Sequence, residues 1–197
     1  MVNPGASLQT HRMDLVIVDD HPAVRAGLRG LVDDEPGLTV VATAATAREG
    51  FEAIADLRPA VALVDLHLPD DDGLSLCLRT RALEHPPRVI IYSAFADAAL
   101  AVKAAIAGAE AVLPKTATPR ALIAVLKGEL RPPLEPRALR AVGASLEPDE
   151  LAILGMLAHG VSESEMATTL GLDPELALAR RAAILAKLGR GRTPAAA

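Results

Sequence analysis

Five short runs of apolar residues, separated by stretches with helical spacing, constrain the fold of this 197-residue chain more than any other feature. The runs recur at similar intervals, at residues 15–18, 38–42, 61–64, 89–92 and 111–113. After each run, apolar residues repeat every three or four positions, over residues 24–32, 47–57, 74–83, 97–107 and 119–126. Such alternation predicts a parallel β-sheet, and nearly continuous apolar strands indicate that helices cover both of its faces. We therefore expect an α/β fold built from five β–α pairs.

The composition narrows the class of protein. Hydrophobic residues make up 51% of the chain and charged residues 23%, which is typical of a globular protein. The single cysteine, Cys77, cannot form an internal disulfide and fits a reducing compartment. No apolar run approaches the ~18 residues of a membrane span, and residues 1–10 lack a signal-peptide pattern. We expect a cytoplasmic protein without membrane attachment, and the net charge of −5 predicts no general attraction to nucleic acid.

Carboxylates follow two of the five predicted strands. Asp19 and Asp20 come directly after the first apolar run, and Asp65 comes directly after the third. The carboxyl ends of parallel strands meet at one edge of the sheet, where open α/β sheets place their ligands. Three carboxylates that meet there can hardly all stay ionised unless a cation joins them. The sequence therefore predicts an acidic, cation-binding site at this edge.

Two further polar residues follow the remaining strands of this half of the chain. Ser93 comes after the fourth apolar run and Lys115 after the fifth, and an acidic loop with a proline connects Asp65 to Gly73. In this order and spacing, residues 13–128 resemble the receiver domain of bacterial two-component response regulators. The resemblance implies that Asp65 accepts a phosphoryl group from a phosphohistidine of a cognate sensor histidine kinase. It also implies that the Ser93 hydroxyl and the Lys115 ammonium contact the transferred group.

The same resemblance implies Mg²⁺ as the cofactor. The expected ligands are all oxygen donors of the kind that this hard ion prefers: Asp19, Asp20, the Asp65 carboxylate and the backbone carbonyl of His67. The three aspartates at 70–72 are expected to form a solvated turn rather than to bind the ion. Phosphatases of the haloacid dehalogenase type typically require a second acid two residues after their nucleophile, where this chain has His67. Beyond self-phosphorylation and self-dephosphorylation, we predict no enzymatic activity.

The fifth apolar run departs from the receiver pattern at Val112. Many receivers have an aromatic residue near this position, and its rotamer couples to the hydroxyl residue. Valine is β-branched and has no large ring to move. The coupling is then altered, or carried by Tyr92 or Phe95; the simpler interpretation is that both rings fill the core.

The second half of the chain changes character. Residues 129–145 contain three prolines and no sustained pattern, which is typical of a linker. Residues 146–192 carry only helical signals, and Ser162 opens a capping box. The predicted helices span residues 150–158, 162–171 and 174–189. They resemble the small all-α LuxR-type helix-turn-helix domain of NarL-family regulators, which implies transcriptional control through DNA.

The third predicted helix departs from its family where DNA is read. Hydrogen-bonding side chains are expected there, whereas this chain has Leu176 and Leu178, which can neither read base edges nor hold phosphates. Residues 146–197 hold five Arg and Lys against seven Asp and Glu, and sequence-independent affinity for DNA depends on cations. The candidate DNA-contacting cations are Arg180, Arg181, Lys187, Arg190 and Arg192, although Arg181 falls where the family has an apolar core residue.

Two functions follow from these patterns. The first is a response regulator that accepts a phosphoryl group on Asp65 and controls transcription through its C-terminal helix-turn-helix. The alternative is a phosphorylation-dependent regulator whose degenerate helix-turn-helix does not bind DNA directly. Leu176 and Leu178 would then bury against a partner protein or a second copy of the chain. The simpler interpretation is that these leucines pack against the linker or the receiver.

Overall fold

A computed structural model describes residues 12–158, 161 and 163–189 of the chain. Along the chain its elements are β1 (Met13–Val18), α1 (Pro22–Asp33), β2 (Leu38–Ala44), α2 (Ala47–Leu57), β3 (Val61–Asp65), α3 (Gly73–Thr80), β4 (Arg88–Ser93), α4 (Ala98–Ala107), β5 (Ala111–Pro114), α5 (Pro119–Leu126), α6 (Pro136–Gly143), α7 (Pro148–Ala158), α8 (Glu163–Leu170) and α9 (Pro174–Lys187). The predicted α/β class, with a group of helices after it, is confirmed. The expected capping box at Ser162 and the N-terminal residues 1–10 lie outside the described residues.

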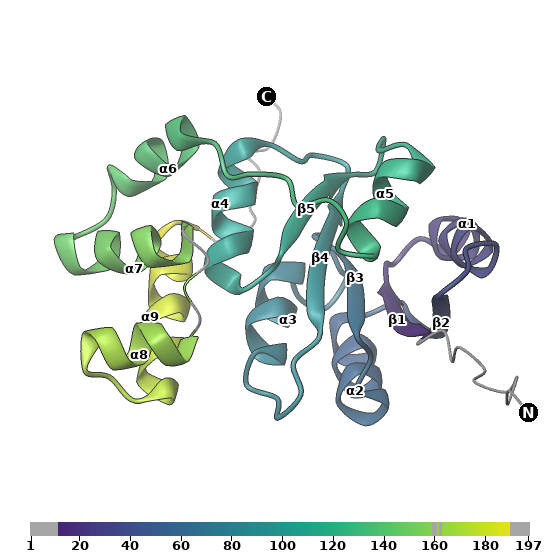
Figure 1. Ribbon diagram of the computed structural model, residues 1–197, viewed down its shortest axis with the longest axis horizontal. Coiled ribbons are helices and arrows are strands. Elements are labelled where there is room, and N and C mark those ends of the chain that lie inside the picture. The colour runs from purple at the N-terminus through teal and green to yellow at the C-terminus, as the bar shows by residue number, and fades with distance from the viewer. Residues whose placement is uncertain (1–11, 159–160, 162, 190–197) are drawn as a thin grey trace, which may run out of the picture.

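The five strands form one parallel sheet in the order β2-β1-β3-β4-β5 (Figure 1). The strand order reverses at β1, because β2 lies on one side of it and all later strands lie on the other. Open α/β sheets bind ligands at such a switch point, outside the carboxyl ends of the strands. The topology alone therefore directs attention to the ends of β1 and β3.

Alternate residues of each strand contribute to two hydrophobic cores. Leu15 and Ile17 of β1 point to the face that α1 and α5 cover, whereas Val16 and Val18 point to the face covered by α2, α3 and α4 (Figure 1). Successive strand residues point to opposite faces of a sheet. A strand between two cores must therefore be apolar at every position, which explains the continuous apolar runs in the sequence.

Helix boundaries follow local capping signals. At four helix starts in the receiver half, a side chain accepts a hydrogen bond from the backbone N–H three residues later, as N-cap residues do: Thr46, Asp72, Asp97 and Thr118. Helix α3 ends at Thr80, before the predicted end at residue 83. The chain beyond it tightens, because the N–H groups of Ala82 and Leu83 donate to carbonyls three residues earlier.

The segment expected to be a linker without a regular pattern contains helix α6. Pro136 stands in its first turn, where the missing N–H of a proline leaves no hydrogen bond unmade. Ala138 and Val142 are buried, and α6 packs against α4. The expectation was therefore wrong for this part of the segment, because a proline that opens a helix resembles one that interrupts it.

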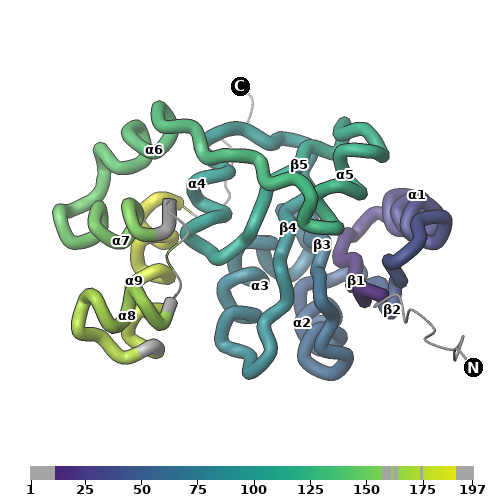
Figure 2. Tube along the Cα trace, viewed as in Figure 1, coloured from purple at the N-terminus to yellow at the C-terminus, as the bar shows by residue number. Residues whose placement is uncertain are grey.

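Helices α6, α7 and α9 pack against α4, so that the C-terminal helices lie beside the receiver sheet (Figure 2). Helix α4 is apolar on nearly every side, and such a helix requires cover on its outer face as well as its inner face. Ile153 of α7 and Ile184 of α9 belong to the same hydrophobic cluster as Val102 and Ile106 of α4. No helix among the described residues is long and apolar enough to cross a membrane.

Candidate functional site

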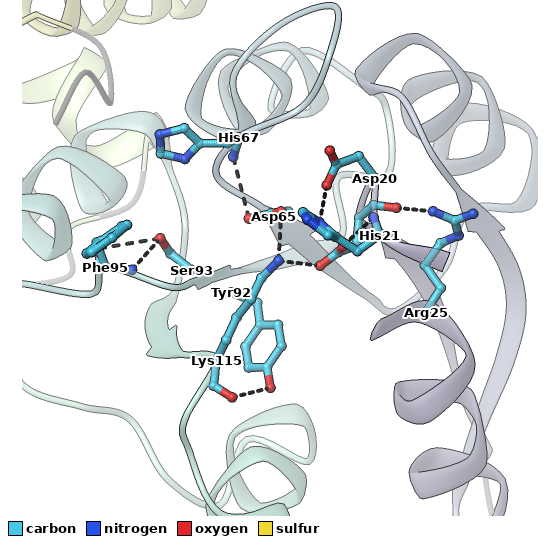
Figure 3. A network of polar contacts seen from close by, with 10 residues as sticks. Asp20, His21, Arg25, Asp65, His67, Tyr92, Ser93, Phe95 and Lys115 are labelled. Carbon is cyan, nitrogen blue, oxygen red and sulfur yellow. Dashed lines mark hydrogen bonds and ion pairs between the residues drawn. The ribbon is translucent and has the colours of Figure 1, made fainter. Parts of the chain in front are cut away.

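Three charged side chains meet at the switch point of the sheet. Asp19 follows β1 and Asp65 ends β3, and only 1% and 5% of their surfaces are exposed. Lys115 follows β5, and its ammonium donates to Oδ2 of Asp19 at 2.7 Å and to Oδ2 of Asp65 at 2.8 Å. Figure 3 shows the lysine reaching across the ends of the strands toward Asp65. The fold thus brings together residues from the first, third and fifth strand ends, as the sequence predicts.

The electrostatics of this centre favour a charged lysine. Burial lowers the pKa of Lys115, but its hydrogen bonds to Asp19 and Asp65 outweigh burial, and the pKa is raised above its ordinary value. Asp20 brings a third carboxylate to the same edge. One ammonium faces three carboxylates, so the site keeps an excess of negative charge.

The carboxylates form a candidate metal centre. One atom from each of Asp19, Asp20, His21 and Asp65 lies within 4.8 Å of the others. Three of the four groups are carboxylates, and the excess negative charge suits a divalent cation with oxygen ligands. The donor set therefore fits Mg²⁺. His21, which was not among the predicted site residues, donates its backbone N–H to Oδ1 of Asp19 at 2.8 Å and places its ring nitrogen 2.5 Å from a carboxylate oxygen of Asp20.

The loop after Asp65 carries the remaining predicted metal ligand, the backbone carbonyl of His67. The backbone N–H of His67 lies 3.5 Å from Oδ1 of Asp65, and its ring points away from the carboxylates (Figure 3). The side chain of His67 is exposed, and its contact with Asp65 is made by the backbone N–H.

Ser93 ends β4 beside the acidic centre and is only 1% exposed. Its hydroxyl oxygen accepts a hydrogen bond from the backbone N–H of Phe95 at 3.2 Å. Phe95 is 67% exposed, so the interpretation that its ring fills the core is wrong. Strand β4 has ended at Ser93, and the chain leaves the sheet at this point. Tyr92 is buried, as that interpretation expects, and its hydroxyl donates to the backbone carbonyl of Lys115 at 3.2 Å.

Comparison with known proteins agrees with this geometry. Residues 15–127 match the response regulator receiver domain family. The chain belongs to that family. It is 30% identical to the DNA-binding transcriptional activator DevR/DosR of Mycobacterium tuberculosis (strain ATCC 25618 / H37Rv) over 92% of this chain and 90% of the relative.

Solved structures agree as well. A LuxR-family response regulator from Aurantimonas sp. SI85-9A1 is 32% identical and superposes with a TM-score of 0.57, covering 66% of this chain and 94% of that one. RcsB from Salmonella enterica serovar Typhimurium, solved on promoter rprA, shares the fold over 92% of this chain and 94% of its own, at 23% identity and a TM-score of 0.55. This protein is thus a two-component response regulator of the NarL/LuxR type.

Two residues of the response regulator that sequence reasoning did not assign to the site hold its loops. Arg25 of α1 donates a hydrogen bond to the backbone carbonyl of Asp19. Asp70, in the expected turn, accepts hydrogen bonds from the backbone N–H groups of Ala47 and Arg48 at 2.7 and 3.0 Å. No sequence signal predicts either contact, because each joins residues from separate elements of the fold. The N-cap role of Asp72, by contrast, follows a recognisable local pattern.

The predicted DNA-contacting cations of the response regulator differ in their surroundings. Arg180 is exposed, whereas Arg181 is only 3% exposed. The guanidinium of Arg181 donates to the backbone carbonyls of Ile106 at 2.7 Å and of Ala105 at 3.1 Å, in the last turn of α4. In this arrangement Arg181 is not accessible to DNA, because the receiver covers it.

The remaining predicted cations lie at the end of α9 and beyond. Lys187 is exposed, and its ammonium lies 2.8 Å from a carboxylate oxygen of Glu150 in α7. The hydrogen bond to Glu150 raises the pKa of Lys187 against the opposing effect of burial. Arg190 and Arg192 lie outside the described residues. Among the described cations of α9, only Arg180 and Lys187 therefore face solvent.

Proposed function

We propose that Asp65 is the phosphoacceptor of this response regulator and that a phosphohistidine of a cognate sensor histidine kinase is the donor. The observation that carries the proposal is the ammonium of Lys115, shared between Asp19 and Asp65 at the switch point of the sheet. The proposed nucleophile Asp65, the cation Lys115 and the proposed metal ligand Asp19 are thus joined by direct contacts. Phosphoryl transfer depends on such positioning and charge neutralisation.

In this reaction an oxygen of the Asp65 carboxylate bonds to phosphorus while the phosphorus–nitrogen bond of the donor breaks. The imidazole nitrogen keeps the electron pair, and the product is an acyl phosphate on Asp65. Lys115 holds its contact with Asp19 and exchanges its contact with Asp65 for one with a phosphoryl oxygen. In self-dephosphorylation, water attacks the phosphorus and Asp65 leaves as a carboxylate with release of a proton.

Asp19, Asp20, the Asp65 carboxylate and the His67 carbonyl would hold Mg²⁺, which would supply positive charge to the phosphoryl oxygens. The protein contributes the placement of these donors. His21 and Arg25 hold the turn that carries the acid pair, through their hydrogen bonds to the side chain and the carbonyl of Asp19.

Ser93 connects the phosphoryl group to the C-terminal helices. Its hydroxyl donates to the backbone carbonyl of Phe95 at 3.4 Å and accepts from the N–H of the same residue at 3.2 Å, at the start of the loop that leads into α4. When the hydroxyl turns its proton to a phosphoryl oxygen, its hydrogen bond to the Phe95 carbonyl is lost and the loop can move. Helix α4 packs against α6, α7 and α9, so the movement reaches the C-terminal helices directly. This route runs through Ser93, Phe95 and α4 and does not use an aromatic residue on β5, where this chain has Val112.

The output proposed first is control of transcription through DNA. Residues 13–128 form the receiver, residues 129–145 the connection that contains α6, and residues 146–192 the output helices.

The relative DevR/DosR is described as a DNA-binding transcriptional activator, and the chain aligns with 90% of its length. Exposed Arg180 and Lys187 are the described cations that can meet phosphates. Both a kinase partner and a DNA target imply a cytoplasmic protein.

A second output is favoured by one observation, the burial of Arg181 against α4. Leu178, at a position where DNA would be read, lines a groove of about 520 Å³ together with Phe51 and Leu78 of the receiver. In this alternative α9 is a surface for protein contact, either with its own receiver or with a partner, and does not bind DNA.

One experiment separates these outputs. Wild type and Asp65→Asn are treated with a small phosphodonor and Mg²⁺, and duplex DNA binding is then measured at low and raised salt. DNA control predicts binding that strengthens on phosphorylation of wild type alone and weakens in Arg180→Ala, with Arg137→Ala on α6 as the charge-matched control. Binding that is absent in both states at low salt would support the protein-contact output. If wild type gains no phosphoryl group, the assignment of Asp65 is wrong.

A further inference from the structure

The loop that follows Asp65 is closed at its base by backbone contacts. The N–H of Gly73 donates to the carbonyl of Leu66 at 2.8 Å, and His67 pairs with Asp72 in an antiparallel bridge. A methyl group added to Gly73 would lie 2.2 Å from the backbone carbonyl of Asp65, so the returning strand of the loop touches the nucleophile's own backbone. Any displacement of the loop is therefore transmitted to Asp65.

The tip of this loop is attached to a different element. The two carboxylate oxygens of Asp70 accept hydrogen bonds from the N–H groups of Ala47 at 2.7 Å and Arg48 at 3.0 Å, in the first turn of α2. Thr46 accepts the next donor, the N–H of Glu49, at 3.1 Å. The first turn of a helix carries unpaired N–H groups and a partial positive charge, so a carboxylate is favoured there. Asp70 thus bridges two parts of the chain through two charge-assisted bonds.

Burial opposes the charged form of Asp70, but the backbone N–H donors of Arg48 and Ala47, with the nearby positive charge of Arg48, together outweigh it. The pKa of Asp70 is lowered accordingly. The carboxylate is ionised at neutral pH and keeps both contacts. The loop therefore has two fixed points, its base beside Asp65 and its tip at α2.

We propose that Asp70 is a positioning residue for phosphoryl transfer, which fixes the loop between Asp65 and Gly73 so that the His67 carbonyl and the Asp65 carboxylate keep the geometry needed by Mg²⁺. The proposal rests on the function proposed above for Asp65. Without the attachment at the tip, the loop can rotate about its base, and the carbonyl of His67, two residues after the nucleophile, moves with it. Residues that orient metal ligands affect metal affinity in this way.

The test compares Asp70→Ala with wild type in two measurements on the full chain. Mg²⁺ alone is titrated, and the amide chemical shifts of the loop are followed by NMR. The initial rate of phosphorylation by a small phosphodonor is followed by intact mass. We expect Asp70→Ala to lose roughly tenfold in Mg²⁺ affinity and in phosphorylation rate, which is the lower end of the range for residues that orient ligands. Asp70→Asn keeps one acceptor oxygen and is expected to show an intermediate loss.

Two control variants separate positioning from other causes. Thr46→Ala removes the N-cap of the same helix α2 without touching the loop, and Asp71→Asn removes a negative charge from the neighbouring position. Both are expected to keep Mg²⁺ affinity within twofold of wild type, about the scatter of such comparisons. If either control reproduces the loss, or if Asp70→Ala matches wild type in affinity, the positioning role is wrong.

The proposed function can fail separately. If wild type binds Mg²⁺ but gains no phosphoryl group on Asp65, the function proposed for Asp65 is wrong, while the Mg²⁺ titrations of the four variants still decide whether Asp70 positions the loop. If Asp70→Ala unfolds, Asp70→Asn carries the same comparison, because it is similar in shape to the native residue.

Discussion

The site at Asp19, Asp65 and Lys115 and helix α9 each contain a cationic side chain, but the two cations have different surroundings. At the edge of the sheet, Lys115 donates to two carboxylates, and in the proposed reaction a phosphoryl group replaces one of these contacts. In α9, Arg181 donates to backbone carbonyls at the end of α4 and is covered by protein. The first cation contacts side chains of the proposed reaction site, whereas the second joins α9 to α4. The role of a charged residue therefore depends more on the groups that its side chain contacts than on whether it is a lysine or an arginine.

The largest effect is expected from Lys115→Met, which leaves Asp19 and Asp65 together without their cation. Removal of one partner from a buried ion pair typically costs about 3–5 kcal/mol, and we expect about 3 kcal/mol because the lysine is partly exposed. Mg²⁺ should restore part of the loss, since it takes over the neutralisation. Urea unfolding with and without Mg²⁺ measures both effects. Lys127→Met, which breaks a peripheral pair with Glu35, is the control and should cost less than about 1 kcal/mol.

Arg181→Ala tests the other half of the comparison. The substitution removes the guanidinium that donates to the Ile106 carbonyl and, beside the N–H of Gly108, to the Ala105 carbonyl, and it removes a buried side chain. We therefore expect a loss of about 2–3 kcal/mol in the free energy of unfolding. Hydrogen exchange should rise in both α4 and α9. Arg180→Ala on the same helix is exposed and should stay within about 0.5 kcal/mol of wild type. Equal effects of the two variants would contradict the role of Arg181 as an interdomain contact.

Gly73→Ala tests how tightly the pocket's loop is built. The added methyl would stand 2.2 Å from the carbonyl of Asp65, so the backbone must shift, at a cost of about 1–2 kcal/mol. The rate of phosphorylation should fall by more than the loss of folding stability alone would cause, because the shift moves the backbone of Asp65, the proposed nucleophile. Gly27→Ala in α1, whose added methyl meets nothing within 4 Å, is the matched control and should stabilise by about 0.5–1 kcal/mol. A phosphorylation rate unchanged by Gly73→Ala would argue against a fixed loop.

The smallest effect concerns an ion pair at the opposite end of the sheet. The hydrogen bond from Arg88, against an opposing effect of burial, holds the pKa of Glu110 below its ordinary value of 4.5, and Arg131 assists. Because the folded-state pKa is depressed, the stabilisation is present above pH 4.5 and is lost as the pH falls through the folded value. Glu110→Gln should therefore cost about 1 kcal/mol at neutral pH. The difference from wild type should narrow in acid, as measured by urea unfolding; a constant difference would show that charge is not the cause.

The parts of the pocket that were predictable from sequence lie at strand ends. Asp19, Asp65, Ser93 and Lys115 come directly after apolar runs, and a parallel sheet brings such positions to one edge whatever the details of packing. The contact of Asp70 with α2 was not predictable, because its partners are 22 and 23 residues away and on another element.

The C-terminal half shows the limits of sequence patterns more clearly. Helix α6 was missed because Pro136 was taken to interrupt a helix rather than to open one. The basic run at Arg180 and Arg181 shows two adjacent cations, and Arg181 falls at a position where LuxR-type domains have an apolar core residue, which indicates burial. That Arg181 donates to carbonyls of α4 depends on how the C-terminal helices pack against the receiver, and no local pattern encodes that packing.

The most direct test of the central claim, that chemistry at Asp65 is transmitted through α4 to α9, is hydrogen exchange in wild type and Asp65→Asn before and after treatment with a small phosphodonor and Mg²⁺. Intact mass of the same samples reports the phosphoryl group. We predict that wild type gains one phosphoryl group and that exchange then rises in peptides of α4 and α9, whereas Asp65→Asn shows neither change. Unchanged exchange in phosphorylated wild type, or equal changes in both proteins, would contradict the account.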